Sequence, residues 1–403
     1  MVTYPSEWDA LTLGDLGQVK MCKRIFQSQT RPYGQIPFYK IGTFGGVADA
    51  YISRELFDEY KSLYSFPRRG DVMISAAGTI GRTVVYDGKD AYFQDSNIVW
   101  LDVNPKEVDR TFLKYYYQTY PWVNLEGTTI SRLYNDIIRK TDIHLPPLPE
   151  QEEIAKTLLE FDTYIADLAE LIEKKRGIRD SALEDLMSGK TRAECHAEEW
   201  STATLKQLCY LITKQTGFDY SEVIKCSLVQ AKTDEVIPFI QNKDFEGLNV
   251  NLRTDYYIPK SVAVKYPKIL LDEKCLLISI SGKLGNVGVY DKKELSFVGS
   301  AICIARLNDK RLAEWIMYYI QSPAGQKELL KSEKASSHRN LTIADIRNMN
   351  IPLPKDNERN AIVDTMKAMD EEIEALEIER DKMIQIREGA MNDLLTGHVR
   401  LSV

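Results

Sequence analysis

The chain has 403 residues, which exceeds one typical domain and suits two domains with additional segments. Its composition, 44% hydrophobic and 28% charged, is typical of a soluble globular protein, and its net charge of −7 argues mildly against a nucleic-acid partner. We expect no secretory signal, because no basic start precedes an apolar core, and no membrane span, because the richest apolar stretch (269–280) is short and charged.

The cysteines and histidines indicate neither a metal site nor a disulfide framework. The six cysteines are scattered, none forms a C-x-x-C pair, and only four histidines are present. Free cysteines in this pattern favour a reducing compartment, and we expect a cytoplasmic protein with no bound metal.

The first globular region, residues 1–149, is predicted to be mainly β-structure with a helix late in it. ISAAGTIGRTVVYDG at 74–88 places a glycine-bearing turn between two apolar runs and predicts a hairpin. Residues 92–103 predict further strands. TFLKYYYQTY at 111–120 has the aromatic spacing of a helix, and its rings are expected in the core rather than around a cofactor.

Residues 150–190 predict a long helix. Pro149 stands where a helix can begin but not continue, and the glutamates that follow suit the positive end of the helix dipole. Gly189 predicts a left-handed glycine cap at the other end. Apolar residues recur every three or four positions, which is the seam of a coiled coil, at Ile154, Leu158, Phe161, Ile165, Leu168, Ile172 and, after a polar interruption, Leu186.

The second half of the chain repeats this order. A second β-rich region occupies 191–357, with a hairpin at 278–292 and a helix near 314–322, and a second long helix spans 358–396 before a tail at 397–403. Asp356 or Asn357 is expected to cap this helix and Gly397 to end it. Its seam is predicted at Ile362, Met366, Met369, Ile373, Leu376 and Leu394.

The two halves are copies of one unit. At an offset of 208 residues, 143–192 matches 351–400 without a gap and with 17 identities, and the hairpins correspond at an offset of 204. The fold class is therefore predicted as α+β, with two β-rich domains separated by two long helices and related by a pseudo-two-fold repeat.

The segment LMSGKTR at 186–192 is similar to the end of a phosphate-binding loop. Such a loop needs glycine at position 184, where Glu184 stands, and the second copy, LLTGHVR at 394–400, lacks the lysine and threonine. The segment is therefore interpreted as a helix stop that each copy uses.

The helices are expected to pair as an antiparallel coiled coil. Each would extend for about 58 Å at about 1.5 Å per residue, and the termini of an intervening domain tend to lie close together. The second helix should then begin where the first ends and return beside it, with one domain at each end. The alternative is that each helix packs only on its own domain.

Acidic residues concentrate in these helices. Residues 150–190 carry eleven acidic against six basic residues, and 358–398 carry eleven against five, so the rest of the chain has a net charge of +4. The acidic total therefore does not exclude contact between the β-rich domains and phosphates.

Polar loops of both domains supply candidate DNA contacts, since their side-chain types suit base edges and phosphates. The two hairpins keep their glycines but differ at two polar positions, with Thr79 against Lys283 and Arg82 against Asn286. Two domains that recognise different base sequences would show this pattern. Random sequence drift on exposed turns predicts the same pattern. The candidates are Lys40, Thr43, Ser75, Thr79, Arg82, Gln94, Asn97, Thr128, Thr129, Ser131 and Arg132 in the first domain, and Gln241, Asn242, Lys243, Ser279, Ser281, Lys283, Asn286, Ser300, Ser336, Ser337, His338 and Arg339 in the second.

The repeated tails resemble those of a known family. IHLPPLPEQEEIAKTLLEFD enters the first helix, and LEDLMSGKTR and MNDLLTGHVR close the two helices. In these motifs and in its whole-chain repeat, the sequence resembles the specificity (S) subunits of Type I restriction–modification systems. The second entry departs from the pattern, with Arg359 in place of glutamine.

The resemblance implies a non-catalytic, sequence-specific DNA-binding subunit that reads a bipartite, asymmetric site. It implies that the helices dock two adenine methyltransferase (M) subunits, which hold the S-adenosylmethionine, and that restriction (R) subunits join. The sequence itself shows no motif of a methyltransferase, nuclease or serine hydrolase. Two alternatives stay open: a coiled-coil scaffold whose end domains bind protein or carbohydrate, and an enzyme with an unusual site.

Overall fold

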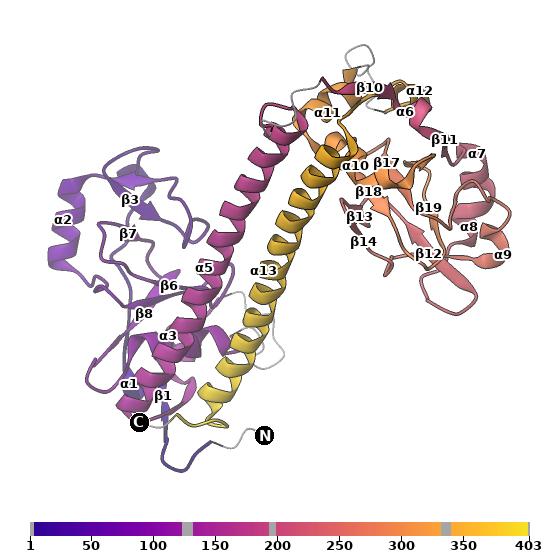
Figure 1. Cartoon of the computed structure of the whole chain (residues 1–403). Helices are drawn as coiled ribbons and strands as arrows, with labels where there is room; N and C mark the ends of the chain where they lie inside the picture. The colour runs from indigo at the N-terminus through magenta and orange to yellow at the C-terminus, as the bar shows by residue number, and fades with distance from the viewer. Residues whose placement is uncertain (1–3, 123–131, 193–198, 332–339, 402–403) are drawn as a thin grey trace. The chain divides into compact units, whose positions relative to one another are not determined.

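The computed structural model describes residues 4–122, 132–192, 199–331 and 340–401 (Figure 1). It divides into two compact units, unit 1 (Met1–Ala169 with Glu377–Val403) and unit 2 (Glu170–Leu376). Each unit therefore contains one β-rich domain and one half of each long helix. No helix in the described ranges is long and apolar enough to cross a membrane.

The described part of unit 1 contains three small sheets. Strand β1 (Asp9–Thr12) pairs with β9 (Asp142–Leu145). A four-stranded sheet has the order β2-β8-β5-β6, formed by Gly17–Lys20, Ile98–Val103, Val72–Ser75 and Thr83–Val85. A three-stranded sheet has the order β4-β3-β7, formed by Tyr51–Ile52, Ile36–Tyr39 and Tyr92–Phe93, and its β3–β7 pair is parallel.

Short helices complete unit 1. They are α1 (Leu13–Leu16), α2 (Arg54–Leu63), α3 (Arg110–Thr119) and α4 (Asn135–Arg139). Helix α3 begins where the Asp109 side chain accepts a hydrogen bond from the Phe112 amide, and it turns the rings of Phe112, Tyr115 and Tyr117 into the core. The predicted helix at 111–120 is thus confirmed to within one residue.

Unit 2 repeats this topology. Strands β10 (Ser201–Thr204) and β21 (Asn350–Leu353) pair, and a four-stranded sheet has the order β11-β20-β17-β18, formed by Cys209–Lys214, Ile302–Leu307, Cys275–Ser279 and Val287–Tyr290. The second sheet has the order β15-β12-β19-β16, formed by Tyr257–Pro259, Val236–Ile240, Ser296–Val298 and Leu270–Leu271. Its β12–β19 pair is parallel, as β3–β7 is in unit 1. The sequence repeat is therefore also a repeat of strand order.

The remaining elements of unit 2 are a hairpin and short helices. Strands β13 (Phe245–Glu246) and β14 (Asn249–Val250) form an added hairpin. The helices are α6 (Leu205–Leu208), α7 (Gly217–Asp219), α8 (Lys225–Ser227), α9 (Lys260–Ala263), α10 (Ala313–Gln321), α11 (Pro323–Leu329) and α12 (Ile343–Arg347). Helix α10 corresponds to α3 and lies almost entirely in the core.

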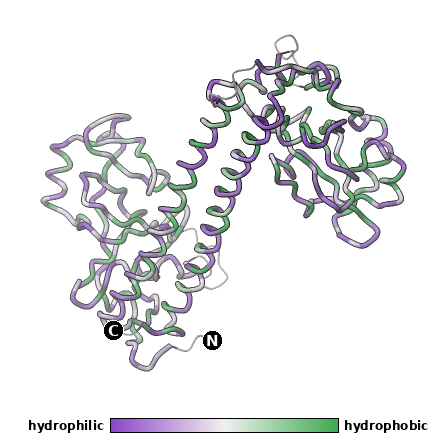
Figure 2. The backbone as a smooth tube through the Cα atoms, in the orientation of Figure 1, coloured by the Kyte–Doolittle hydropathy of each residue, from purple (hydrophilic) through white to green (hydrophobic). Residues whose placement is uncertain are grey.

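The long helices are α5 (Leu148–Met187) and α13 (Asp356–Thr396). Each begins two residues before the predicted start, and Asp356, expected as a cap, is the first helical residue instead. Gly189 and Gly397 both have φ of +71°, which confirms the predicted left-handed caps. Figure 2 shows hydrophobic and hydrophilic residues alternating along both helices, as expected of helices with one buried face.

The helices run antiparallel within each unit. In unit 1, Asp162 of α5 bonds Arg387 of α13, and Tyr164 bonds the earlier residue Glu379. In unit 2, Lys175 pairs with Glu372, at 2.7 Å between Nζ and Oε1, and Arg179 pairs with the earlier residue Asp370.

The predicted seam residues are buried or half-buried throughout. Those nearest the helix ends lie in domain cores: Ile154, Leu158 and Leu394 in unit 1, and Ile362 and Met366 in unit 2. Phe161, Ile165, Met369, Ile373, Leu376 and Leu186 are half-buried, while Leu168 and Ile172 are buried. The helices thus pack both on each other and, near their ends, on the domain of the same unit.

Gln151, near the start of α5, connects the helix to neighbouring backbone by hydrogen bonds. Gln151 is fully buried; its Oε1 accepts from the Asp109 amide, and its Nε2 donates to the Glu107 and Pro146 carbonyls, all within 3.0 Å. In unit 2 the buried Arg359 occupies this position, with Nη1 3.0 Å from Asp356. The departure seen in the sequence therefore replaces hydrogen bonds to three backbone groups by an ion pair within α13.

We predict that Gln151→Ala lowers the free energy of unfolding of unit 1 by about 2–4 kcal/mol, because three backbone groups in buried or partly buried hydrogen bonds lose their partner. Urea denaturation measures this change. Glu152→Ala, at the neighbouring exposed position, is the control and should change it by less than about 0.5 kcal/mol. Equal effects of the two substitutions would contradict the role of these hydrogen bonds.

Candidate nucleic-acid interface

Three loops of unit 1 meet beside the hairpin formed by β5 and β6. Within the hairpin turn, Ser75 Oγ accepts from the Arg82 amide at 2.9 Å and donates to the Thr79 carbonyl. Arg82 Nη1 reaches across to the Phe44 carbonyl at 3.0 Å, and Gln94 Oε1 accepts from the Ile41 amide at 2.9 Å. The predicted loops at 39–46, 78–82 and 94–97 are therefore tied into one surface.

Arg132 lies on the same surface. Its backbone pairs with Ala77 beside the hairpin, and its Nη2 donates to the Ser96 carbonyl at 2.8 Å. Ser96 has a positive φ of 53°, the value of a tight turn.

The same surface exists in unit 2 with different side chains. Asn286, at the position of Arg82, donates from Nδ2 to the Phe245 carbonyl at 2.7 Å and to the Asn242 carbonyl at 3.2 Å. Asn242 Nδ2 in turn donates to the Ser281 carbonyl at 2.6 Å. Residues 241–247 and the hairpin turn are thus joined as their counterparts are in unit 1.

The first turn of each surface is closed by one side chain. Thr43 Oγ1 accepts from the Lys40 amide at 3.0 Å in unit 1, and Asp244 Oδ2 accepts from the Gln241 amide at 2.8 Å in unit 2. Burial raises the pKa of Asp244. Different residue types therefore give the two turns the same shape.

An open cleft lies at the carboxyl ends of the parallel strands in each unit. The cleft in unit 1 has a volume of about 540 Å³ and includes Lys40 and Gln94 in its wall. The cleft in unit 2 has a volume of about 340 Å³ and is lined by Gln241, Asn242, Lys243 and Ser300 among others. Six of the predicted contact residues thus gather in two equivalent clefts.

Burial separates the predicted contact residues into groups. Thr79, Arg82, Lys243 and Lys283 are exposed, and the half-buried ones are Lys40, Thr43, Gln94, Asn97, Arg132, Gln241, Asn242, Ser281 and Ser300. Ser75, Ser279 and Asn286 are buried and direct their hydrogen bonds into the turns, so we assign them to shaping the turn rather than to contact. Thr128, Thr129, Ser131, Ser336, Ser337, His338 and Arg339 lie outside the described residues.

Sequence reasoning missed part of the cleft walls. Gln27, Thr30 and Arg31 line the cleft in unit 1, and Tyr220 lines that in unit 2. The polar run SQTR at 28–31 was a signal, but only the pairing of Arg31 with Tyr51 brings it beside Lys40.

A clamp joins the ends of the long helices in each unit. In unit 2, Nε and Nη2 of Arg192 donate to the two oxygens of the buried Glu358 carboxylate, at 2.9 and 3.0 Å, and Trp200 Nε1 donates to it at 3.1 Å. In unit 1, Arg400 and Trp8 hold Glu150 in the same way. The repeated motif therefore ends one helix and binds the start of the other.

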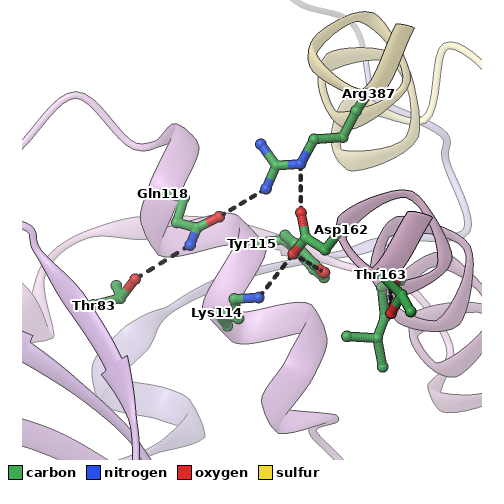
Figure 3. A network of polar contacts seen from close by, with 8 residues as sticks. Thr83, Lys114, Tyr115, Gln118, Asp162, Thr163 and Arg387 are labelled. Carbon is green, nitrogen blue, oxygen red and sulfur yellow. Dashed lines mark hydrogen bonds and ion pairs between the residues drawn. The ribbon is translucent and has the colours of Figure 1, made fainter. Parts of the chain in front are cut away.

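A second repeated network lies further along the helices (Figure 3). In unit 1, Arg387 Nε bonds Asp162 Oδ1 at 2.7 Å, and Oδ2 of the same carboxylate accepts from Tyr115 OH at 2.7 Å and from Lys114 at 3.1 Å. Arg387 Nη2 lies 3.4 Å from Gln118 Oε1. Although burial opposes it, hydrogen bonds from Tyr115 and Lys114 keep the pKa of Asp162 below its ordinary value.

Unit 2 contains the same arrangement. Arg179 Nε bonds Asp370 Oδ1 at 2.9 Å, Tyr318 OH donates to Oδ2 at 2.7 Å, and Arg179 Nη2 lies 2.9 Å from Gln321 Oε1. Burial and then the Asp370 carboxylate raise the pKa of Tyr318. The two arginines, read in the sequence as interruptions of the seam, are therefore the residues that connect α5, α13 and the domain of each unit.

The described part of the chain contains no cluster of histidine, cysteine or acidic residues that could hold a metal ion. Its cysteines at 22, 209, 226, 275 and 303 are free thiols.

A family model described as the Type I restriction modification DNA specificity domain matches the chain twice, at residues 5–176 and 197–384. The chain belongs to this family. The two matches correspond to the two halves of the repeat, so each unit contains most of one DNA specificity domain.

Relatives of this family member are specificity subunits. The Type I restriction enzyme MjaVIII specificity subunit of Methanocaldococcus jannaschii is 23% identical over 98% of this chain and 94% of that protein. The EcoBI specificity subunit of Escherichia coli is 24% identical over 60% of this chain and 54% of that protein. S.HindORF215P of Haemophilus influenzae is 54% identical over 160 residues, which span 40% of this chain and only 42% of that protein.

Solved structures share the fold of this family member. The Type I restriction–modification S subunit of M. genitalium matches with a TM-score of 0.57 and 17% identity over 96% of each chain. A chain from a structural study of complex assembly and conformational transition of the type I R-M system matches with a TM-score of 0.56 and 16% identity, over 98% of this chain and all of that one.

Lys283, exposed on the hairpin turn of unit 2, lies 3.3 Å from the exposed Glu246 and is free to exchange this partner for a phosphate. We predict that Lys283→Ala weakens DNA binding to a similar extent on all sequences and reduces the slope of log affinity against log salt by about 1. Fluorescence anisotropy at several salt concentrations measures both quantities. Lys190 is an exposed lysine just after the end of α5, and Lys190→Ala is the control. If Lys283→Ala changed the base preference and left the slope unchanged, the prediction would be contradicted.

Proposed function

We propose that this chain reads a bipartite, asymmetric DNA sequence, one half with each domain, as the non-catalytic specificity subunit of a Type I restriction–modification complex. The observation that carries the proposal is the pair of equivalent loop surfaces. Their turns share backbone geometry and buried supports, yet present Thr79 and Arg82 in one unit against Lys283 in the other. Different exposed groups on one framework are suited to different half-sites.

We further propose that the long helices dock two adenine methyltransferase subunits. Both helices keep large apolar side chains exposed to solvent, namely Leu159, Leu171 and Ile178 on α5 and Ile378 and Ile386 on α13. Large apolar residues exposed at several points along a helix favour a protein partner. S-adenosylmethionine would bind to these partner subunits and not to this chain, and restriction subunits would join the same assembly. Cytoplasmic localisation stays a prediction.

The direct test is to produce the chain with the adenine methyltransferase subunits that co-purify with it and to sequence the methylated adenines. One bipartite motif with a single gap and unlike halves is expected. DNA affinity without salt dependence, or no methylation motif at all, would favour a scaffold that binds protein or carbohydrate.

The two half-sites should be recognised independently. We predict that Arg82→Ala changes the bases accepted in one half of the motif and leaves the other half unchanged, because Arg82 belongs to unit 1 alone and keeps exposed guanidinium donors. Methylation-site sequencing reports both halves. Arg139→Ala removes the same charge from an exposed helix of unit 1 and should preserve the motif; a shift of both halves by Arg82→Ala would count against independent reading.

The gap between the half-sites is expected to follow the length of the helices. Helix α5 has 40 residues, or about 60 Å at about 1.5 Å per residue, which matches about 18 base pairs at about 3.4 Å each. We predict that inserting seven residues in both helices, after Ala169 and after Leu376, lengthens the gap by about 3 base pairs, because a heptad keeps the seam in phase.

The insertion points follow the boundary between the two units in each helix, so the contacts within each unit are kept. Seven residues inserted in α5 alone are the control; they leave the two helices unequal and should abolish methylation. An unchanged gap after the double insertion would refute the role of helix length.

A further inference from the structure

We propose that the repeated Arg–Asp–Tyr–Gln network is a positioning device that fixes the orientation of each recognition domain on the helix pair and thereby restricts methylation to one gap length. Its members are Tyr115, Gln118, Asp162 and Arg387 in unit 1, and Tyr318, Gln321, Asp370 and Arg179 in unit 2. This inference rests on the proposed function.

All four residue types recur although their surroundings have diverged. Between TFLKYYYQT at 111–119 and EWIMYYIQS at 314–322, only two tyrosines and one glutamine are identical. The glutamine and one of these tyrosines belong to the network; the second tyrosine, at 116 and 319, does not. Lys114, which also bonds Asp162, is replaced by Met317 and is therefore an accessory partner.

The geometry restricts rotation of the domain helix. Tyr115 and Gln118 lie one turn apart on α3, and both are held by the same ion pair between α5 and α13. A single contact would allow α3 to pivot, whereas two contacts one turn apart fix its direction. The charged partners have side-chain exposures of 19% and 28% in unit 1 and 17% and 31% in unit 2, so their bonds are partly protected from water.

The network reaches the candidate DNA-reading hairpin in unit 1. Gln118 Nε2 lies 3.4 Å from Thr83 Oγ1, and Thr83 follows Arg82 directly in the chain (Figure 3). The helix pair and the hairpin are thus separated by one glutamine side chain.

In unit 2 the glutamine meets the equivalent strand through a glycine. A Cβ on Gly247 would lie 3.2 Å from Gln321 Nε2, and Gly247 exchanges backbone hydrogen bonds with Val287 and Val289 of β18. The position has φ of +59°, so glycine provides both the conformation and the space for the glutamine. Both glutamines therefore end beside the second strand of a recognition hairpin.

The test uses the complete complex and a library of sites in which the gap differs by one base pair from that of the unaltered complex. The double variant Tyr115→Phe/Gln118→Ala removes both hydrogen bonds between α3 and the ion pair, and it leaves the ion pair between Asp162 and Arg387 itself. We expect the ratio of methylation at the original gap to that at the altered gaps to fall about tenfold, with the bases of both half-sites unchanged.

Lys114→Met is the matched control, because unit 2 itself has methionine at this position, and it should leave the ratio unchanged. Gln321→Asn shortens the equivalent side chain in unit 2 without removing its polar group, and it should also lower the ratio. This variant decides the test if the double variant does not fold. An unchanged ratio in the folded variants would overturn the inference, as would a changed base preference at the original gap. Absence of any bipartite motif with the unaltered complex would instead refute the proposed function.

Discussion

The pairing of aspartate with arginine between the long helices is the interaction on which the two units depend. Each helix carries the aspartate in its first half and the arginine in its second half. Antiparallel helices therefore place Asp162 opposite Arg387 and Arg179 opposite Asp370, whereas parallel helices in the same register would place like charges together. Because these groups are only partly exposed, facing like charges would be costly, and the charge pattern itself selects the direction of pairing.

The ends of the two long helices are also joined by ion pairs between one helix and the other. Arg192 follows the glycine cap of α5 but bonds Glu358 at the start of α13, and Arg400 follows the cap of α13 but bonds Glu150 at the start of α5. Trp8 and Trp200, each directly before the first strand of its domain, also donate hydrogen bonds to these glutamates. The motif that is similar to a phosphate-binding loop is thus present twice because two helix ends need closing, and neither closure uses the lysine or threonine of the first copy.

The recognition surfaces separate support from variation. Ser75, Ser279 and Asn286 are buried and saturate the turns, so a change there would alter the shape of the loops. Thr79 and Lys283 are exposed beside them and differ between the units, whereas the position of Arg82 and Asn286 both supports a loop and differs. This division allows one fold to present two sets of hydrogen-bonding groups without changing its backbone.

The sequence by itself determined the repeat, the two long helices, their glycine ends and the hairpins, because periodic apolar residues and glycine turns are local signals. It also located the loops that form the candidate surface. The tertiary structure alone decided that Asn286 supports a turn, that Arg31 lines a cleft, and that Arg179 and Arg387 join helices to domains. Those roles depend on partners far away in the chain, such as Asp370 for Arg179, and no local pattern specifies which distant residues a folded backbone brings within hydrogen-bonding distance.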